Sequence, residues 1–252
     1  VVDKLNFSYP DASEKTFSDL SFSANGYQKI GLVGPSGSGK STLIKILAGF
    51  LPLSKEGEKI FINGKNAELY NSDDWRDQIA YIPQDPYIFS ATIADNIAFY
   101  SPDIDRSVIE RSAAEAGLND FISSLPDGLD TNIGDQGREI SGGQAQRIAL
   151  ARIFAEPRRK IIFLDEPTAH LDLETEYQLK GTLQKVMEDH LVFFSTHRLH
   201  WLKQMDKILV LDNKSIAEAG SYSDLISKKG KLYQMVKELQ PKGDLKFVQG
   251  KK

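Results

Sequence analysis

The sequence contains no cysteine, no long apolar run and no strong excess of charge of either sign. Without cysteine, disulfides, zinc ribbons and cysteine nucleophiles are excluded. No apolar stretch approaches the roughly 18 residues that cross a bilayer as a helix, and no signal peptide is recognisable. With 31 basic and 35 acidic residues, the formal net charge is −4. This balance does not favour a nucleic-acid-binding surface, and we expect no nucleic-acid partner.

The 252 residues suffice for one large α/β domain or two small ones with a substantial core. The chain begins Val1-Val2-Asp3 without a methionine and enters a strand pattern almost at once. We interpret it as a fragment of a longer polypeptide, the alternative being a natural subunit whose leader was trimmed. We expect one domain over residues 1–240, with a mostly helical part over about 86–156, and a loose tail over 241–252.

Local patterns place strands and helices along this domain. The first third has strand patterns and turns, with a hairpin at Asn63-Gly64, a pair that tolerates positive φ. The apolar runs Ile161–Leu164 and Leu191–Ser195 are typical of buried parallel strands. A helical pattern at Leu173–Met187 lies between them. These segments predict a βαβ unit and hence an α/β fold.

A glycine-rich stretch, GPSGSGKST, follows the apolar residues 30–33 and precedes a helical pattern. This is the setting of the phosphate-binding loop GxxxxGK[ST], although a Gly/Ser-rich connector is the alternative. Glycines let backbone N–H groups face the phosphates, and the helix start adds partial positive charge. Lys40 can reach the β and γ phosphates, Ser41 can ligate Mg²⁺, and Thr42 can support the α phosphate. The predicted nucleotide-binding residues are Gly34, Pro35, Ser36, Gly37, Ser38, Gly39, Lys40, Ser41 and Thr42.

Two carboxylates, Asp165 and Glu166, follow the apolar run at residues 161–164. The carboxyl ends of strands are where α/β folds bind ligands. Asp165 can hold Mg²⁺ through water, and Glu166 can orient or deprotonate an attacking water. Alone, the pair is more typical of a polar loop. Together with the phosphate loop it indicates nucleotide chemistry, without separating kinases, GTPases and transport ATPases.

The segment Ile140-Ser141-Gly142-Gly143-Gln144 stands between these two sites and precedes a helical run. It resembles the ABC signature LSGGQ, with isoleucine in place of leucine. The Ser141 hydroxyl and the amides of Gly142 and Gly143 can bind a γ-phosphate at a helix start. An ordinary serine N-cap describes the same residues locally, and the two interpretations are compatible.

Four more positions resemble ABC ATPases in the expected order. Gln84 resembles the Q-loop glutamine that senses Mg²⁺ and water, and His197 resembles the switch histidine that contacts the γ-phosphate. Tyr9 resembles the aromatic residue that stacks on adenine, with strand-face packing as the alternative. The segment AHLD at 169–172 resembles the D-loop, with His170 where serine is common. We expect His170 to be a surface residue and leave its role open.

This ordered set covers residues 2–239 and identifies the chain as a member of the ABC ATPase family. The resemblance implies an α/β P-loop core with a mixed, largely parallel sheet, an N-terminal antiparallel β part and an inserted α-helical part. It implies ATP and Mg²⁺ as cofactors and a second ABC domain as partner, with two ATP molecules bound head to tail. The implied catalytic residues are Glu166, His197, Gln84 and Lys40; the metal-binding residues are Ser41, Gln84 and Asp165; the signature residues are Ser141, Gly142, Gly143 and Gln144.

Two segments resemble the exporter branch, namely PQDPYIFSATIADNI at 83–97 and the X-loop IGDQG at 133–137. In exporters this domain usually follows six transmembrane helices, so a transmembrane domain of the same polypeptide and a place at the cytoplasmic face of the membrane are expected. The segments DEPTAHLDLETE and THRLHW are similar to the CydD/CydC half-transporters of cytochrome bd assembly, described as exporting cysteine and glutathione. A lipid or multidrug exporter is the alternative.

Two other classes of protein are alternatives to a transporter. Soluble ABC proteins of repair or translation usually carry two cassettes or long inserts, whereas one cassette is present here. A P-loop kinase would leave the signature and His197 unexplained. The sequence identifies neither the transported substrate nor whether the dimer contains one kind of chain or two.

Overall fold

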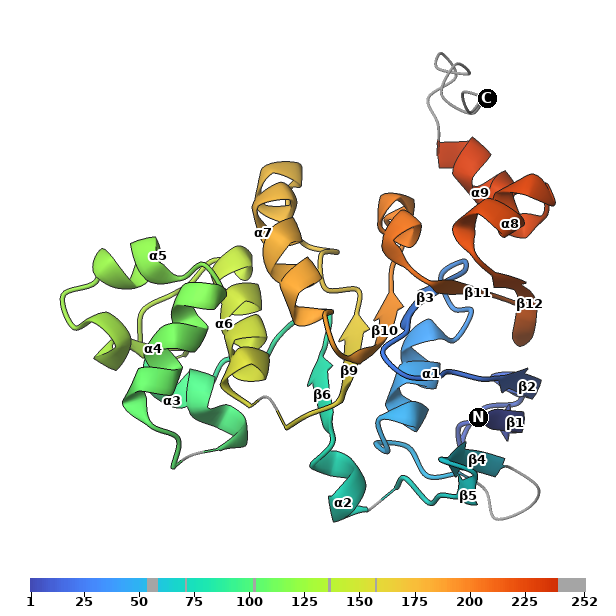
Figure 1. The fold of residues 1–252 in the computed structure, drawn as a ribbon, viewed down its shortest axis with the longest axis horizontal. Coiled ribbons are helices and arrows are strands. Elements are labelled where there is room, and N and C mark those ends of the chain that lie inside the picture. The colour runs from blue at the N-terminus through green and yellow to red at the C-terminus, as the bar shows by residue number, and fades with distance from the viewer. Residues whose placement is uncertain (54–58, 71, 102, 136, 157, 240–252) are drawn as a thin grey trace.

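The computed structural model describes residues 1–53, 59–70, 72–101, 103–135, 137–156 and 158–239. These residues form a six-stranded core sheet, a four-stranded antiparallel sheet and a helical part to one side (Figure 1). In the described ranges no helix combines the length and hydrophobicity needed to span a bilayer. The expected tail at 241–252 and Gln136 of the X-loop lie outside the described residues.

The core sheet has the strand order β12-β11-β3-β10-β9-β6. Neighbouring strands from β11 to β6 are parallel, and β12 pairs antiparallel at the edge. The predicted βαβ unit is confirmed, because α7 (Leu173–Val186) connects β9 to its parallel neighbour β10. The strands are β3 (Lys29–Val33), β6 (Ile79–Ile82), β9 (Ile161–Asp165), β10 (Leu191–Ser195), β11 (Lys207–Asp212) and β12 (Ser215–Gly220).

Alternate side chains of the core strands face opposite layers, as the pleat of a strand requires. On β9, Ile162 and Leu164 pack with α6 (Gly142–Ala155), α7 and Trp201 of the 3₁₀ helix η3 (Leu199–Gln204). Phe163 packs on the other face with α1 (Lys40–Leu47) and the N-terminal strands. Burial on both faces explains why these strands read as continuous apolar runs.

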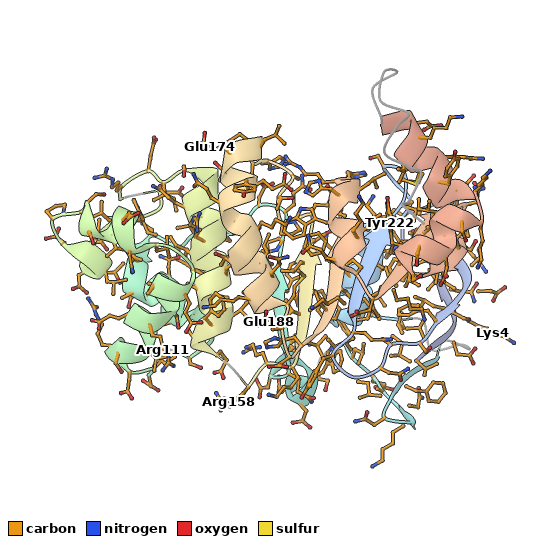
Figure 2. The ribbon with its side chains drawn as sticks, turned by 45° about the horizontal axis from the view of Figure 1, so that its top comes forward. Lys4, Arg111, Arg158, Glu174, Glu188 and Tyr222 are labelled. Carbon is orange, nitrogen blue, oxygen red and sulfur yellow. The ribbon has the colours of Figure 1, made fainter. Side chains whose placement is uncertain are left out.

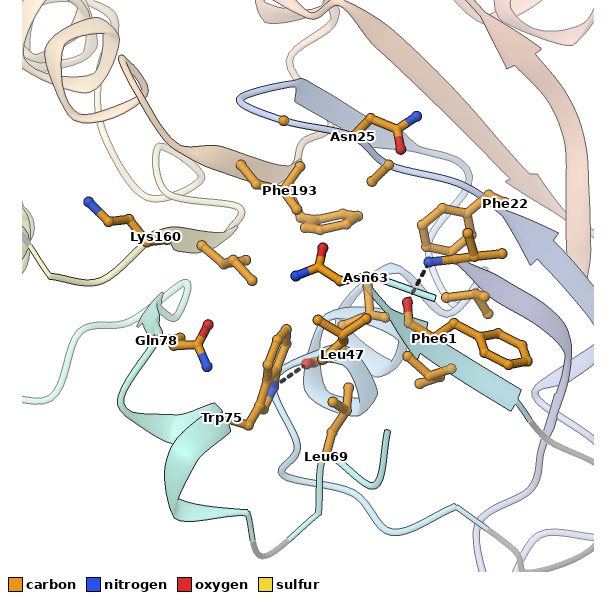
Figure 3. A pocket seen from close by; sticks show the side chains of 18 of the residues that line it. Phe22, Asn25, Leu47, Phe61, Asn63, Leu69, Trp75, Gln78, Lys160 and Phe193 are labelled. Atoms are coloured by element: carbon orange, nitrogen blue, oxygen red, sulfur yellow. Dashed lines mark hydrogen bonds between the residues drawn. The ribbon is translucent and has the colours of Figure 1, made fainter. Parts of the chain in front are cut away.

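The N-terminal sheet has the order β2-β1-β4-β5, formed by β1 (Val2–Phe7), β2 (Phe17–Phe22), β4 (Lys59–Ile62) and β5 (Lys65–Asn66). The predicted hairpin joins β4 to β5, with φ of 50° at Asn63 and 78° at Gly64. Between this sheet and the amino-terminal ends of β9 and β10 lies an apolar cavity of about 410 Å³ (Figure 3). Trp75 on α2 (Asp73–Arg76) closes one side of it and donates a hydrogen bond to the Leu47 carbonyl, 2.9 Å away.

The predicted helical part contains a separate hydrophobic cluster, which includes Ile93, Ile109 and Ile148. Arg152 on α6 ties this part together, donating to the carbonyls of Asn96 at 2.8 Å and Tyr87 at 2.9 Å. The structure adds a short antiparallel strand pair, β7 (Ala91–Thr92) with β8 (Asn132–Ile133), within the segment expected to be mostly helical. Its helices are α3 (Ile93–Ile97), η1 (Ala98–Tyr100), α4 (Arg106–Glu115), α5 (Asn119–Ser123), η2 (Gly128–Asp130) and α6.

Two C-terminal helices, α8 (Tyr222–Ser227) and α9 (Lys231–Leu239), follow the edge strand β12 (Figure 1). Acidic and basic side chains are both exposed, including Arg111 on α4, Glu174 on α7 and Glu188 in the turn after α7 (Figure 2). The exposed charges of both signs agree with the near-balanced composition.

Replacing Gly181 by alanine is expected to stabilise the fold. Gly181 is an exposed glycine within α7, and a Cβ added there meets nothing within 4 Å. Glycine loses more backbone entropy on folding than alanine, so Gly181→Ala should raise the free energy of unfolding by about 0.5–1 kcal/mol. Denaturant unfolding of both chains measures this. A decrease in stability would mean that the Gly181 face of α7 tolerates no methyl group.

Candidate functional site

The predicted phosphate loop connects β3 to α1, so it begins at the carboxyl end of a central strand. Gly37 and Gly39 have φ of 78° and 96°, a conformation that costs L-residues 1–2 kcal/mol or so. A Cβ on Gly39 would lie 2.7 Å from two ring carbons of Phe17, whereas a Cβ on Gly37 would meet nothing within 4 Å. The loop therefore needs glycine at Gly39 for both its backbone angle and its packing.

Lys40 begins α1 with its ammonium held inside the loop. Its Nζ donates to the carbonyls of Gly34 at 3.1 Å and Pro35 at 3.3 Å. Burial lowers the pKa of Lys40, and the nearby Glu166 and Asp165 carboxylates oppose that shift. Within the described part of the chain, the buried Ser38 hydroxyl has no hydrogen-bond partner. A buried cation and an unused hydroxyl in one loop suit a ligand with several oxygen acceptors.

Asp165 ends β9, and one of its carboxylate oxygens accepts hydrogen bonds from two hydroxyl groups. Ser41 Oγ donates to its Oδ1 at 2.9 Å, and Ser195 Oγ donates to the same atom at 2.7 Å. Ser195 is fully buried and was not singled out from the sequence. It ends β10, and its register places it beside Asp165 on the parallel neighbour β9. Recognising that β9 and β10 end together would have revealed it.

The hydroxyl and carboxylate oxygens of Ser41 and Asp165 fit Mg²⁺, which prefers hard oxygen ligands. The described residues contain no group of three or more His, Cys, Asp or Glu side chains that could hold a metal alone. That sparseness also fits Mg²⁺, because it is usually bound by one or two carboxylates together with phosphate oxygens and water. These ranges therefore contain no set of His, Cys and carboxylate ligands of the kind that binds zinc.

Glu166 directly follows Asp165 with an unusual φ of 51°. Its N–H donates to Ser195 Oγ at 2.9 Å, which holds this turn at the strand end. Its Oε1 lies 2.8 Å from His197 Nε2 and 3.8 Å from Lys40 Nζ. Backbone strain at a functional site persists only where the surroundings enforce it, and here the end of β10 does so.

A cavity of about 290 Å³ lies beside Glu166 and His197. Gln84, which follows β6, and His170, which follows β9, line the same cavity. His170 is partly a surface residue, as expected, with its side chain 57% exposed. It also contacts Gln84, which the sequence did not predict. The structure thus brings Gln84, Glu166, His170 and His197 to one cavity.

Tyr9 lies next to the start of α1. Its hydroxyl is 3.2 Å from Thr42 Oγ1, and its ring packs edge-on against Phe7 with centroids 5.1 Å apart. The side chain is nevertheless exposed. Packing against Phe7 and an open ring face coexist, so both interpretations of Tyr9 given above are compatible with its geometry.

The signature residues begin α6, where Ser141 is the N-cap. Ser141 Oγ accepts from the Gln144 N–H at 3.2 Å, and the Ser141 N–H donates to Gln144 Oε1 at 2.8 Å. This reciprocal capping box leaves the first N–H groups of α6 at the surface. The helices α6 and α7 pack on one face of the core sheet and α1 packs on the other. In Figure 1 the strands β6 and β9 lie between α6 and α1, so α6, which begins after Ser141, lies apart from the helix that follows the phosphate loop.

Comparisons with known proteins show which family has this fold and this arrangement of residues. A family model described as ABC transporter matches residues 17–169. The chain is 49% identical over 223 residues to the glutathione/L-cysteine transport system ATP-binding/permease protein CydC of Bacillus subtilis, covering 88% of this chain and 39% of that protein. It is 38% identical over 243 residues to an ATP-dependent lipid A-core flippase of Cupriavidus metallidurans, covering 95% and 40%.

Among solved structures, a bacterial Atm1-family ABC exporter with ATP bound superposes with a TM-score of 0.85 at 32% identity. The match covers 96% of this chain and 42% of that one. The chain thus spans about two fifths of the length of these relatives. The family model, the shared fold and the relatives agree: the chain belongs to the ABC transporter family, as an ATPase domain of the exporter type.

Proposed function

We propose that this chain supplies two half-sites for ATP and works in a head-to-tail pair with a second ABC domain. The observation that carries the proposal is the separation of the signature helix α6 from α1 and its phosphate loop by strands of the core sheet. One ATP on the loop of Lys40 has no signature residue of its own chain beside it. A partner related by a two-fold or pseudo-two-fold axis supplies that residue to both ATP molecules at once.

In the proposed mechanism, the backbone N–H groups of the phosphate loop and Lys40 bind the β and γ phosphates. Glu166 is at first engaged by His197 and Lys40 through one carboxylate oxygen. When ATP binds, its γ-phosphate attracts the Lys40 ammonium and the His197 ring away from that oxygen. Glu166 is then free to accept a proton from the attacking water. Tyr9 stacks on adenine at the opposite end of the nucleotide.

Mg²⁺, when bound, neutralises developing charge on the transferred phosphoryl group. Ser41 and Asp165 are the residues that would hold it, with Gln84 close to the same site. Ser195 keeps the Asp165 carboxylate in place through its 2.7 Å hydrogen bond. Its contribution is orientation, because a fixed ligand loses less freedom when the ion is bound.

We further infer that hydrolysis drives export through a transmembrane domain of the same polypeptide, with this domain at the cytoplasmic face of the membrane. The γ-phosphate favours the closed pair, and its removal reopens it. The relative at 49% identity supports cysteine and glutathione as cargo, whereas the flippase at 38% supports a lipid. ATP-dependent uptake of glutathione and of labelled lipid into inverted vesicles carrying the longer protein separates these two candidates.

The half-site proposal predicts complementation between two inactive variants. Lys40→Ala removes the phosphate ligand, and Gly142→Asp places a negative charge where the partner's γ-phosphate would lie. A Cβ on Gly142 meets nothing within 4 Å, and an acidic residue suits a helix start, so the second variant should fold. Each variant alone should be inactive. An equal mixture should recover about one quarter of wild-type ATPase activity, because half the pairs then contain one intact site of two.

Gly142→Ala is the matched control and should retain most of the activity, since it adds a methyl group without charge. Gly142→Asp should also bind ATP with unchanged affinity, because its own phosphate loop is intact. No recovery in the mixture, with each variant folded, would contradict pairing of two copies of this chain through Ser141 and its neighbours. Activity of Gly142→Asp on its own would contradict it too.

A further inference from the structure

The feature that the proposed mechanism leaves unexplained is His170, which stands where serine is common in related D-loops. Its ring contacts two residues of another segment. His170 Nε2 lies 3.0 Å from Gln84 Nε2, and His170 Nδ1 lies 2.7 Å from Asp85 Oδ1. Gln84 and Asp85 follow β6, His170 follows β9, and these strands are parallel neighbours. The two loops therefore leave the same edge of the sheet and meet through one imidazole.

The chemistry of the three groups fixes the direction of each hydrogen bond. A carboxylate only accepts, so His170 Nδ1 carries the proton that is donated to Asp85. In that tautomer Nε2 has a lone pair and accepts from the Gln84 amide nitrogen. The amide nitrogen of Gln84 is thus committed to His170, and the amide oxygen is not. Amide oxygens, unlike amide nitrogens, are ligands for Mg²⁺ and acceptors for water.

We propose that His170 is a positioning residue, which holds the Gln84 side chain with its oxygen available to the metal and water of the nucleotide site. The proposal rests on the proposed role of Gln84. Asp85 acts one step further out, by selecting the tautomer of His170. Both Gln84 and His170 line the cavity beside Glu166, which places the oriented amide at the proposed reaction site.

A purely structural role is a weak explanation for this contact. The side chains of His170 and Asp85 are 57% and 79% exposed. Exposed polar pairs of this kind contribute little to stability. A serine at position 170 has a much shorter side chain and loses the reach to Gln84. The imidazole, with two differently assigned nitrogens, is suited to relaying an orientation from Asp85 to Gln84.

The test compares ATP binding by the 252-residue chain with Mg²⁺ and with a chelator. His170→Ser removes both contacts. His170→Asn keeps a polar atom near the Nδ1 position, and His170→Gln keeps one near the Nε2 position. We expect His170→Ser and His170→Asn to lower the gain in ATP affinity on adding Mg²⁺ by about tenfold, as for other outer-sphere partners of metal ligands. His170→Gln should restore the gain to within about twofold.

Affinity in chelator should be unchanged in all three variants, since the phosphate loop is untouched. His190→Ser is the matched control, because His190 contacts only the Glu188 carbonyl among the hydrogen bonds of the described residues. A readout without metal comes from the ¹⁵N shifts of the His170 ring, which should report the Nδ1–H tautomer. They should change in Asp85→Asn, whose amide can donate to Nδ1 instead of accepting from it.

Gln84→Ala distinguishes the proposed role of Gln84 from the positioning role of His170. If Gln84→Ala loses the Mg²⁺ gain while His170→Ser keeps it, the positioning role of His170 is wrong and the role of Gln84 stands. If neither variant changes the gain, the proposed role of Gln84 fails, and the inference about His170 fails with it. If His170→Ser lost the same factor of ATP affinity with Mg²⁺ and with chelator, the proposal would be overturned in favour of a structural role. A large fall in its melting temperature would have the same meaning.

Discussion

Glu166→Gln should abolish ATP turnover while preserving ATP binding. The substitution keeps the size and shape of the side chain and removes its basicity. Loss of a general base costs about 10²–10⁴-fold in rate, and we expect about 10³-fold here. The phosphate loop, Lys40 and the Asp165 oxygens are unaltered, so ATP affinity should stay within a few-fold of wild type. Because ATP is bound and not consumed, the pair should accumulate in its closed form.

Steady-state phosphate release, ATP binding by calorimetry and the sedimentation of the chain in ATP measure the three effects. Glu174→Gln is the matched control, since Glu174 is an exposed acid in the first turn of α7. It should leave all three unchanged. Turnover by Glu166→Gln within tenfold of wild type would rule out Glu166 as the base. A monomer that persists in saturating ATP would contradict the link between bound γ-phosphate and pairing.

Gly39→Val should destroy nucleotide binding and destabilise the fold. Two separate effects act at this position. A β-branched residue is strained at the φ of 96°, and its Cβ would lie 2.7 Å from the Phe17 ring. Strain and overpacking together should cost about 3 kcal/mol in the free energy of unfolding. The displaced loop amides should lower ATP affinity by at least about 100-fold, since several of them bind the phosphates together.

Gly26→Val is a control that introduces backbone strain without overpacking. Gly26 also has a positive φ, 55°, yet a Cβ there meets nothing within 4 Å and the residue lies outside the phosphate loop. This control should lose about 1–2 kcal/mol of stability from backbone strain alone and bind ATP normally. Thermal unfolding and ATP titration of both variants provide the comparison. Tight ATP binding by a folded Gly39→Val chain would show that the loop geometry is not required.

Residues whose partners are close in sequence could be predicted best. The phosphate loop is a strand, a glycine-rich turn and a helix start in direct succession, so its pattern of residue types nearly defines its shape. The capping box of Ser141 and Gln144 and the hairpin at Asn63-Gly64 are local in the same way. The two apolar runs around α7 also predicted a pair of parallel strands, because complete burial leaves an uninterrupted apolar pattern.

Residues whose partners are distant in sequence could not be predicted in this way. Ser195 lies next to Asp165, and His170 next to Gln84, only because β10 and β6 flank β9 in the sheet. Strand order is set by packing over the whole domain, and a local pattern carries little information about it. The helix α8 was not predicted for a different reason, because its six residues are too few to show a clear helical apolar pattern.

By itself, the sequence determined the family and its ATPase activity, and it predicted the residues of the phosphate loop, because those features depend on short segments with fixed spacing. The tertiary structure alone decided how the segments meet. It paired Glu166 with His197 and Lys40, placed Ser195 beside Asp165, joined His170 to Gln84, and set α6 and α1 on opposite faces of the core sheet. The physical reason is that such contacts arise from sheet order and layer packing, where small gains summed over many distant residues select one arrangement.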